Sequence, residues 1–290
     1  MFMRAMKNLF PFVFVVLSIL LSGCVKNNPL PTWLIVDRFE LLDNPSVTEG
    51  ELTEFITDGW IYVNGKFVGI FQLPCKVPVL YEGEALNVII YPTVRMNGMA
   101  HNKVQHPYLD AHNSYETFVA GDSTFISPKT RYATGTQLWI EDFQSGSIKL
   151  TNGIDNNLTL GTIQDPNNSN NRYGQVNLTE ANNRWSVYTT DGLSFTLGRQ
   201  IILEIDYCNS TNISTTVIAG KTDATIVDHP HIRLNAQDPE TMVWKKIYID
   251  VTETVSNSGG YLFWQGIKAN LTEGRTNDTV LIDNIKVVYR

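Results

Sequence analysis

Strict alternation of apolar and polar residues runs through most of the chain after residue 33, and this pattern constrains the fold more than any other feature. Helical spacing, with apolar residues at i, i+3, i+4 and i+7, is almost absent from the same region. The alternating segments are bounded by Gly, Asn, Asp and Pro, residues that favour turns. The sequence therefore predicts an all-β fold.

Asn64-Gly65 joins two alternating segments, GWIYV and KFVGIF, in the first half of the chain. This dipeptide tolerates positive φ at both central positions of a type I′ turn, so a β-hairpin is expected here. A second unit, PVLYEGEALNVIIYPTV, pairs a short strand with a longer one. Together with the flanking strands LIVDRFELL and YETFVAG, these hairpins predict a small β-sandwich over residues 33–127.

The second half of the chain opens with LWIEDFQSGSIKL and closes with VLIDNIKVVY, and further short strands lie between them. Eight or more strands at this spacing predict a larger, two-sheet β-sandwich over residues 138–290. Residues 128–137 contain Pro and Gly, lack alternation and are the expected linker. A shift in the apolar phase between Ile282 and Ile285 indicates a β-bulge in the closing strand.

The first 24 residues have the pattern of an export signal, with Arg4 and Lys7 followed by an apolar run over residues 9–21 and then LSGC. The run is shorter than the roughly 20 residues that a membrane span needs. An ordinary secretory leader that ends near a cysteine is the alternative to a lipoprotein signal. We expect residues 1–23 to be the signal peptide and residues 24–32 a polar tether.

Charge and cysteine content exclude several classes of protein. The chain has 22 basic and 29 acidic residues, and without Arg4 and Lys7 its net charge is −9. A nucleic-acid partner is excluded, because phosphate binding needs a basic surface. Three cysteines are too few for a disulfide scaffold. For Cys75 and Cys208 we prefer two unpaired thiols to a single interdomain disulfide.

Several segments resemble known families. Leu21-Ser22-Gly23-Cys24 resembles the lipobox of bacterial lipoproteins, which implies palmitate-type acylation of Cys24 and a lipid anchor in the outer membrane, on its periplasmic or cell-surface side. YVNGKFVG and the following LP turn resemble PEGA and transthyretin-like modules. The EDF opening strand, the W-K-x-x-x-I-D strand and IDNIKVVY resemble jelly-roll carbohydrate-binding modules and related galactose-binding-like and concanavalin-like domains. The whole chain resembles surface lipoproteins of Bacteroidota.

These resemblances imply a non-catalytic lipoprotein, anchored in the outer membrane, whose jelly roll binds a polysaccharide or a surface protein. A purely structural subunit of an outer-membrane secretion, adhesion or nutrient-uptake assembly is the alternative. A degenerate or unrecognised glycoside hydrolase is the third hypothesis. The three differ in what the second sandwich must present to solvent.

Glu204 and Asp206 are the residues that a hydrolase would use, since glucanases with a related sandwich have E-I-D followed by a second glutamate. Retaining hydrolysis requires two carboxyl groups about 5 Å apart. In this chain the expected acid positions hold Cys208 and Asn209, which cannot donate the proton. We therefore expect Glu204 and Asp206 to lie on the solvent face of an alternating strand.

Aromatic residues in RWSVYT and GYLFWQG are the candidate ligand-binding residues: Trp185, Tyr188, Tyr261 and Trp264. Aromatic rings stack on sugar faces, while the nearby amides of Asn182, Asn183 and Gln265 bind hydroxyl groups. Core packing is the alternative role of such rings. Alternation places Trp185 and Tyr188 on opposite sides of their strand, so we expect at most one of them to be a platform.

A structural calcium ion is the metal that the jelly-roll resemblance implies, at the junction of the first and last strands. The positions that match are Glu141 or Asp142 in the opening strand and Asp283 in the closing strand. Calcium takes six to eight oxygen ligands, and backbone carbonyls would supply the rest. Alternatively, Asp283 only serves the bulge. The five histidines are expected to be solvated loop residues, not metal ligands: His101, His106, His112, His229 and His231.

Overall fold

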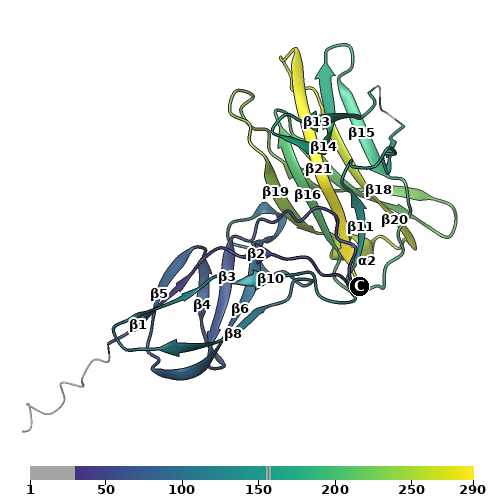
Figure 1. Ribbon diagram of the computed structural model, residues 1–290. Helices are drawn as coiled ribbons and strands as arrows, with labels where there is room; N and C mark the ends of the chain where they lie inside the picture. The colour runs from purple at the N-terminus through teal and green to yellow at the C-terminus, as the bar shows by residue number, and fades with distance from the viewer. Residues whose placement is uncertain (1–29, 155, 157) are drawn as a thin grey trace, which may run out of the picture.

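A computed structural model describes residues 30–154, 156 and 158–290, and it contains two β-sandwiches joined along one side (Figure 1). The prediction of an all-β chain with a smaller and a larger sandwich is confirmed. The signal peptide, Cys24 and most of the tether lie outside the described residues. Within the described part, no helix has the length and apolar character needed to cross a bilayer.

The first sandwich packs a five-stranded sheet against a three-stranded sheet. The larger sheet contains β3 (Asp58–Val63), β4 (Lys66–Gln72), β6 (Gly83–Arg95), β7 (Lys103–Gln105) and β8 (His112–Phe118). The smaller sheet contains β1 (Thr32–Val36), β5 (Cys75–Val79) and β9 (Ser123–Ile126). A two-stranded ribbon of β2 (Glu40–Leu41) and β10 (Lys129–Thr130) follows the chain toward the second sandwich. A 3-10 turn, η1 (Met96–Gly98), links β6 to β7.

The predicted hairpin at Asn64-Gly65 is confirmed. Val63 pairs with Lys66, and both turn residues have positive φ, 49° for Asn64 and 74° for Gly65. Alternation along β3 directs Ile61 and Val63 into the core, where both are fully buried. The local turn chemistry and the apolar pattern therefore specify the same register.

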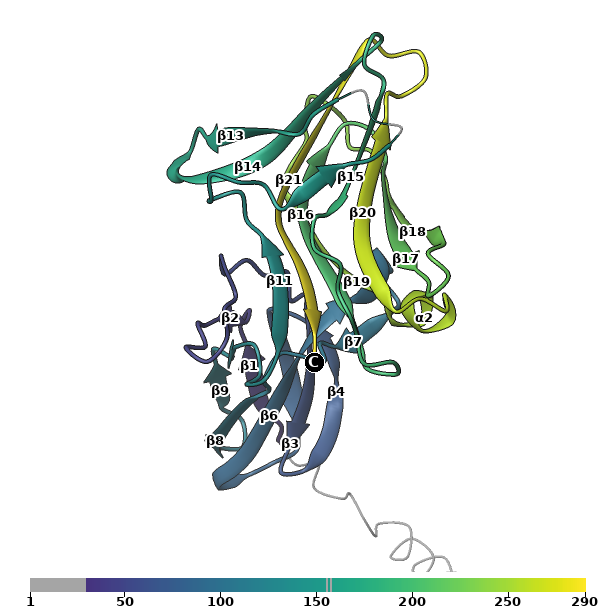
Figure 2. The same ribbon diagram turned by 90° about the vertical axis from the view of Figure 1, so that its right-hand side faces the viewer.

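The second sandwich consists of a six-stranded and a five-stranded sheet. The six-stranded sheet contains β11 (Gln137–Glu141), β13 (Gly161–Asp165), β14 (Asn168–Thr179), β16 (Ile202–Asn209), β19 (Lys245–Asp250) and β21 (Asn277–Tyr289). The five-stranded sheet contains β12 (Leu150–Asn152), β15 (Arg184–Thr189), β17 (Ile213–Gly220), β18 (Ile226–Leu234) and β20 (Leu262–Asn270). A short helix, α2 (Thr252–Asn257), closes one end of the sandwich. Figure 2 shows β15, β20 and β18 in one layer and β11, β21 and β16 in the other.

The core of the second sandwich lies between these two sheets and includes Trp185, Leu203, Val217, Phe263 and Val287. The predicted β-bulge in β21 is confirmed by its pairing with β16. Glu204 pairs with Lys286 and Asp206 with Asp283, so two residues of β21 oppose one of β16. Asn284 in the bulge has a φ of 46°. The bulge changes the phase of β21 so that both halves of the strand keep an apolar side toward the core.

The two sandwiches share a buried surface. Ile202, Tyr248 and Val288 project from the outer face of the six-stranded sheet and belong to the apolar cluster of the first sandwich. The backbone N–H of Asp250 also donates to the side-chain carbonyl of Asn97, at 2.9 Å. The first sandwich therefore covers part of one outer face of the second. The residue boundaries given above for the tether, linker and sandwiches stay predictions.

Candidate functional site

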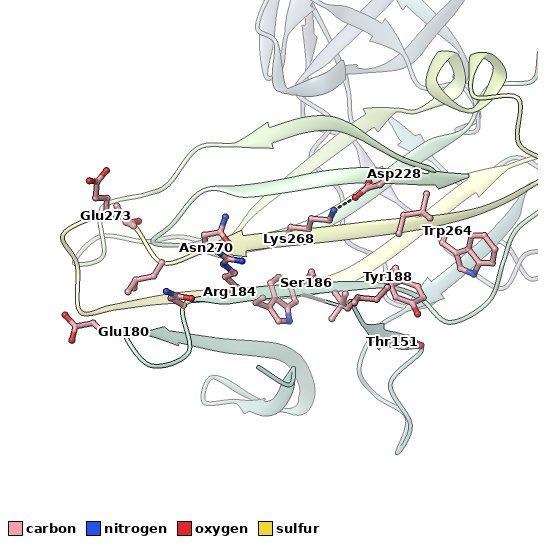
Figure 3. A pocket seen from close by; sticks show the side chains of 18 of the residues that line it. Thr151, Glu180, Arg184, Ser186, Tyr188, Asp228, Trp264, Lys268, Asn270 and Glu273 are labelled. Carbon is pink, nitrogen blue, oxygen red and sulfur yellow. Dashed lines mark hydrogen bonds and ion pairs between the residues drawn. The ribbon is translucent and has the colours of Figure 1, made fainter. Parts of the chain in front are cut away.

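The outer face of the five-stranded sheet in the second sandwich carries a groove of about 1250 Å³ (Figure 3). Side chains from β12, β15, β17, β18 and β20 form its floor, and the segment after β20 lines one end. Most of the side chains on this floor belong to the outward half of each alternating strand, because the inward half fills the core. A β-sandwich offers such an open face only where no other part of the molecule covers it.

Tyr188 and Trp264 lie on this floor, on neighbouring strands. Tyr188 pairs with Gly266, which is two residues from Trp264 on β20, so the two rings occupy diagonal positions. Both side chains are half-buried. The floor therefore presents two aromatic rings on one side of one sheet, an arrangement that offers apolar area to a flat ligand.

Two glycines make room for these rings. A Cβ atom at Gly220 would lie 3.1 Å from the indole of Trp264, so the indole can lie against the backbone of β17. A Cβ atom at Gly266 would lie 2.8 Å from Thr216 Oγ1 and would fill the floor beside Tyr188. The absence of side chains at Gly220 and Gly266 leaves this space on the groove floor open.

Charged side chains of both signs border the groove. Lys268 forms an ion pair with Asp228 across the floor, and both side chains are about 40% exposed, at 42% and 38%. At the end formed by the loops, Glu180 and Glu273 lie near Arg184 (Figure 3). Because acidic and basic groups are mixed, the groove offers hydrogen-bonding groups without a strong charge of one sign.

The four aromatic candidates differ in burial and in their position relative to the groove. Trp185 is 1% exposed and packs in the core, so its ring is not available as a stacking platform. Tyr261 is exposed but lies outside the groove, in the segment before β20. Tyr188 and Trp264 remain candidates, and their role in binding stays a prediction. The expected opposition of Trp185 and Tyr188 across β15 is confirmed.

The amide side chains near these aromatic residues also differ in position. Asn183 lines the groove, whereas Gln265 is buried with its side chain toward the core. Asn182 is exposed in the turn before β15. Only Asn183 therefore lies where its amide could reach a ligand in the groove.

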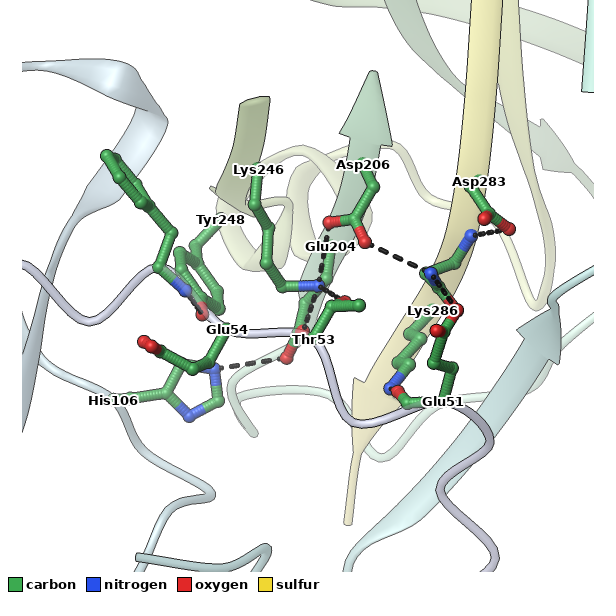
Figure 4. A network of polar contacts seen from close by, with 12 residues as sticks. Glu51, Thr53, Glu54, His106, Glu204, Asp206, Lys246, Tyr248, Asp283 and Lys286 are labelled. Atoms are coloured by element: carbon green, nitrogen blue, oxygen red, sulfur yellow. Dashed lines mark hydrogen bonds and ion pairs between the residues drawn. The ribbon is translucent and has the colours of Figure 1, made fainter. Parts of the chain in front are cut away.

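The opposite outer face of the second sandwich holds Glu204 and Asp206, and here the expectation of a solvent-facing strand is wrong. Glu204 is fully buried and Asp206 is 8% exposed. Their side chains do project outward from the sheet, as alternation requires, but the first sandwich covers them. The segment that carries Glu51, Thr53 and Glu54 passes over this face (Figure 4).

Buried cations neutralise these carboxylates. Lys246 Nζ lies 3.3 Å from Glu204 Oε2 and 3.2 Å from Asp206 Oδ1. Burial raises the pKa of Glu204, but Lys246, His106 and Lys286 oppose it and hold the pKa at about 2. Burial lowers the pKa of Lys286 to about 8, and the nearby charge of Lys246 adds to the effect. This cluster is an ionic interface between the sandwiches, and its carboxylates are not accessible to a substrate.

His106 contradicts the expectation of solvated histidines, since it is 3% exposed with its Nε2 3.3 Å from Glu204 Oε1. The hydroxyl of Tyr132 donates to the same carboxylate. His231 is also held in place, with Nε2 2.9 Å from the carbonyl oxygen of Asp250. His106 is buried because the loop after β7 contributes to the joint between the sandwiches, a contact that its Pro- and Asn-rich sequence does not reveal.

Two of the three carboxylates proposed for calcium, Glu141 and Asp283, accept hydrogen bonds from the backbone. Glu141 accepts hydrogen bonds from the backbone N–H groups of Phe143 and Lys149, which occupy its two oxygens. Asp283 accepts from the backbone N–H of Asn284 in the bulge. Among the described residues, no group of three or more His, Cys, Asp or Glu side chains is arranged to hold a metal ion. Asp283 makes the bulge contact expected as the alternative, and the calcium site stays a prediction.

Cys75 and Cys208 are free thiols, as preferred from the sequence. Burial raises the pKa of both thiols.

Several groove residues are not among those that the sequence pattern indicated. Lys268 is four residues after Trp264, so alternation along β20 would have placed it on the same face. Asp228 and Ile218 could not be found in this way, because their positions depend on the pairing of β17 with β18 and β20. Strand pairing between distant segments is the information that alternation lacks.

No protein-family model matches the chain, and no curated protein sequence matches it. Among solved structures, it is similar to the enzymatically active domain of tailspike protein 4 from bacteriophage CBA120, with 12% identity and a TM-score of 0.37 over 51% of this chain and 20% of that chain. A family 29 carbohydrate-binding module is similar at 12% identity and a TM-score of 0.34, over 53% of this chain and 88% of that chain.

A family 61 carbohydrate-binding module in complex with β-1,4-galactotriose is similar at 8% identity and a TM-score of 0.30, over 49% of this chain and 87% of that chain. The chain thus spans only a fifth of the tailspike structure but most of each small module. With TM-scores below 0.5, these likenesses establish neither a family nor a ligand.

Proposed function

We propose that the protein binds a glycan in the groove on the outer face of the five-stranded sheet. The observation that carries this proposal is the pair of rings, Tyr188 and Trp264, on the floor of an uncovered groove. Aromatic rings provide apolar area for sugar faces, and the amide of Asn183 with the charged groups at the border provides hydrogen bonds. The balance of charge in the groove favours a neutral polysaccharide.

The proposed role is binding without catalysis. Glu204 and Asp206, the residues closest to a hydrolase motif, are buried in ion pairs beneath the first sandwich. Within the groove, Asp228 is paired with Lys268 on the sheet, whereas Glu180 and Glu273 stand at its end. Retaining or inverting hydrolysis needs a carboxyl pair that flanks the scissile bond, so this distribution favours a binding module.

We also propose that Cys24 carries a lipid anchor, which would fix the groove to the outer membrane. The LSGC motif behind a short apolar run supports this part of the proposal. Replacement of Cys24→Ser is expected to leave the protein unlipidated, in the soluble or precursor fraction. If the substituted protein still partitions into detergent as the parent does, the anchor assignment is wrong.

A glycan array followed by calorimetry tests the groove. The array identifies a retained polysaccharide, and titration then compares the parent with Trp264→Ala and Tyr188→Ala. Each substitution is expected to weaken affinity by about 2 kcal/mol, or roughly thirtyfold, as for a buried aromatic anchor. Tyr261→Ala is the matched control, because Tyr261 is an exposed aromatic residue outside the groove.

Two results would contradict the proposal. One is an array that retains no glycan, and the other is a bound glycan whose affinity is the same for Trp264→Ala as for Tyr261→Ala. A protein that instead co-purifies from detergent-solubilised membranes, and does so only when Trp264 is present, would support the structural-subunit alternative.

A further inference from the structure

An apolar patch surrounds the point where the described chain begins. Leu30, Leu80 and Val119 are 69%, 67% and 51% exposed, and Phe125 on the adjoining sheet face is 72% exposed. With the half-buried Trp33, these residues form what we call the entry patch. Large exposed apolar side chains are unremarkable singly, but a group of them marks a surface that contacts something.

Hydrogen bonds hold the segments of the entry patch together. Thr32 Oγ1 lies 2.9 Å from the carbonyl oxygens of both Tyr81 and Val119. The backbone N–H of Gly121 donates to the carbonyl of Pro31, at 3.1 Å. Thr32 pairs with Val79, so Leu80 follows directly beside the start of β1. The patch is therefore part of the fold and is not a loose end of the chain.

The sheet of β1, β5 and β9 extends the patch across a flat face. Ile35 pairs with Phe125, and Trp33 pairs with Pro78. Lys76 Nζ lies 4.9 Å from the centre of the Trp33 ring. Tryptophan and lysine are characteristic of the boundary between water and lipid, because each side chain has an apolar part and a polar end.

The position of the proposed lipid anchor indicates that the bilayer is what contacts the entry patch. Leu30 is six residues after Cys24, and six residues span at most about 20 Å. Figure 1 shows β1 and β5 at one end of the molecule and the second sandwich at the other. An acylated Cys24 would thus hold the entry patch close to the bilayer and the groove away from it.

We propose that the entry patch inserts into the interfacial layer of the lipid bilayer and orients the protein on the membrane. This inference rests on the proposed lipid anchor. The contact does not rely on attraction to anionic lipids, because the exposed acidic residues beside the patch, Glu82 and Asp122, outnumber the basic Lys76. Binding through the patch is therefore insensitive to salt, unlike electrostatic adhesion to anionic lipids.

Fluorescence quenching of Trp33 tests the insertion. The full acylated chain is placed in zwitterionic phosphatidylcholine vesicles that carry a doxyl-labelled lipid, and its quenching is compared with that of Trp33→Phe. The difference between the two isolates Trp33 from the other tryptophans. We expect strong quenching of Trp33 in the parent and loss of it in the double variant Leu80→Ser with Phe125→Ser. Leu197→Ser, at a residue 62% exposed in the second sandwich, is the matched control and leaves the quenching unchanged.

Vesicle flotation of the Cys24→Ser chain without its leader, residues 24–290, gives a second measurement that does not depend on the fluorophore or on the anchor. The Leu80→Ser and Phe125→Ser substitutions are expected to lower its partitioning into the same vesicles by about tenfold. Circular dichroism confirms that the variant is folded.

The proposals fail in different ways. A parent chain that does not float on vesicles contradicts the anchor, whereas one that floats with unquenched Trp33 contradicts insertion of the patch. A Cys24→Ser chain that sediments as a dimer, and that Phe125→Ser converts to a monomer, would assign the patch to a second copy and overturn the inference. Glycan affinity of Trp264→Ala on the same vesicles tests the groove separately, because Trp264 lies outside the entry patch.

Discussion

The two outer faces of the second sandwich carry similar residue types but have different surroundings. The face of β16, β19 and β21 holds the ion pair of Lys246 with Asp206, whose side chains are 5% and 11% exposed. The face of β17, β18 and β20 holds the ion pair of Lys268 with Asp228, whose side chains are 42% and 38% exposed. The first sandwich covers one face, and solvent reaches the other.

This comparison shows that coverage, and not composition, decides what a charged strand face does. On the covered face, each charge has lost its water and depends on its partners, so removal of one partner leaves the other uncompensated. On the open face, water screens the same kind of pair and leaves the groups available to a ligand. We therefore expect substitutions on the covered face to change stability and those on the open face to change binding.

The largest effect is expected for Lys246→Met. The substitution keeps the apolar stem but leaves Glu204 and Asp206 buried without their closest cation. Loss of one partner of a buried pair costs about 3 to 5 kcal/mol in the free energy of unfolding. Urea denaturation measures this loss, and Lys245→Met, at the exposed neighbouring position, is the control. Glycan affinity of the folded fraction should stay unchanged. A loss below about 1 kcal/mol would mean that the first sandwich does not exclude water from this face.

The stability of the protein is expected to depend on pH because of Asp283, which lies at the covered face. Burial raises its pKa to about 7, and the charges of Glu51 and Asp206 add to the effect. Because the unfolded carboxyl has a pKa of about 3.9, the folded state holds this proton more tightly. Its contribution to stability is therefore complete below about pH 4 and is lost as the pH rises to about 7.

Asp283→Asn removes this titration. Between pH 5 and pH 7, the free energy of unfolding of the parent is expected to fall relative to that of the variant, at about 1.4 kcal/mol for each pH unit near pH 5 and more slowly near pH 7. Denaturation at several pH values within this window gives the difference. Parallel curves for the two proteins would show that Asp283 titrates normally and that the bulge is open to water.

Alternation alone supplied much of the architecture. It placed Trp264 and Gly266 on one side of β20, and Asn64-Gly65 located a hairpin through its turn chemistry. The same pattern in Glu204-Ile205-Asp206 gave the correct side of the strand but the wrong environment. Periodicity distinguishes the two faces of a strand, whereas burial of the outward face depends on a second domain that packs there. The position of His106 depends on the same tertiary contact.

Trp264→Ala tests the role assigned to the open face. The indole is half-buried on the groove floor, so its removal is expected to lower glycan affinity about thirtyfold. The effect on the free energy of unfolding is smaller than that of Lys246→Met, because the indole lies against the sheet and not within the core. Calorimetric titration and urea denaturation of the same sample give both quantities. A stability loss as large as that of Lys246→Met, with affinity intact, would reverse the roles assigned to the two faces.

The smallest stability effect is expected for Asp228→Asn. An exposed Lys–Asp pair contributes about 0.2 to 1 kcal/mol, because water screens both charges and the long lysine side chain loses freedom when it is held. A double-mutant cycle with Lys268→Gln measures the coupling, and the same cycle on Asp206 and Lys246 measures its buried counterpart. We expect the buried coupling to exceed the exposed one severalfold. High salt should abolish the exposed coupling and leave most of the buried one, because mobile ions reach the groove but not the joint between the sandwiches. Equal couplings in the two cycles would show that the covered and open faces share one dielectric environment, which would remove the physical basis of the comparison.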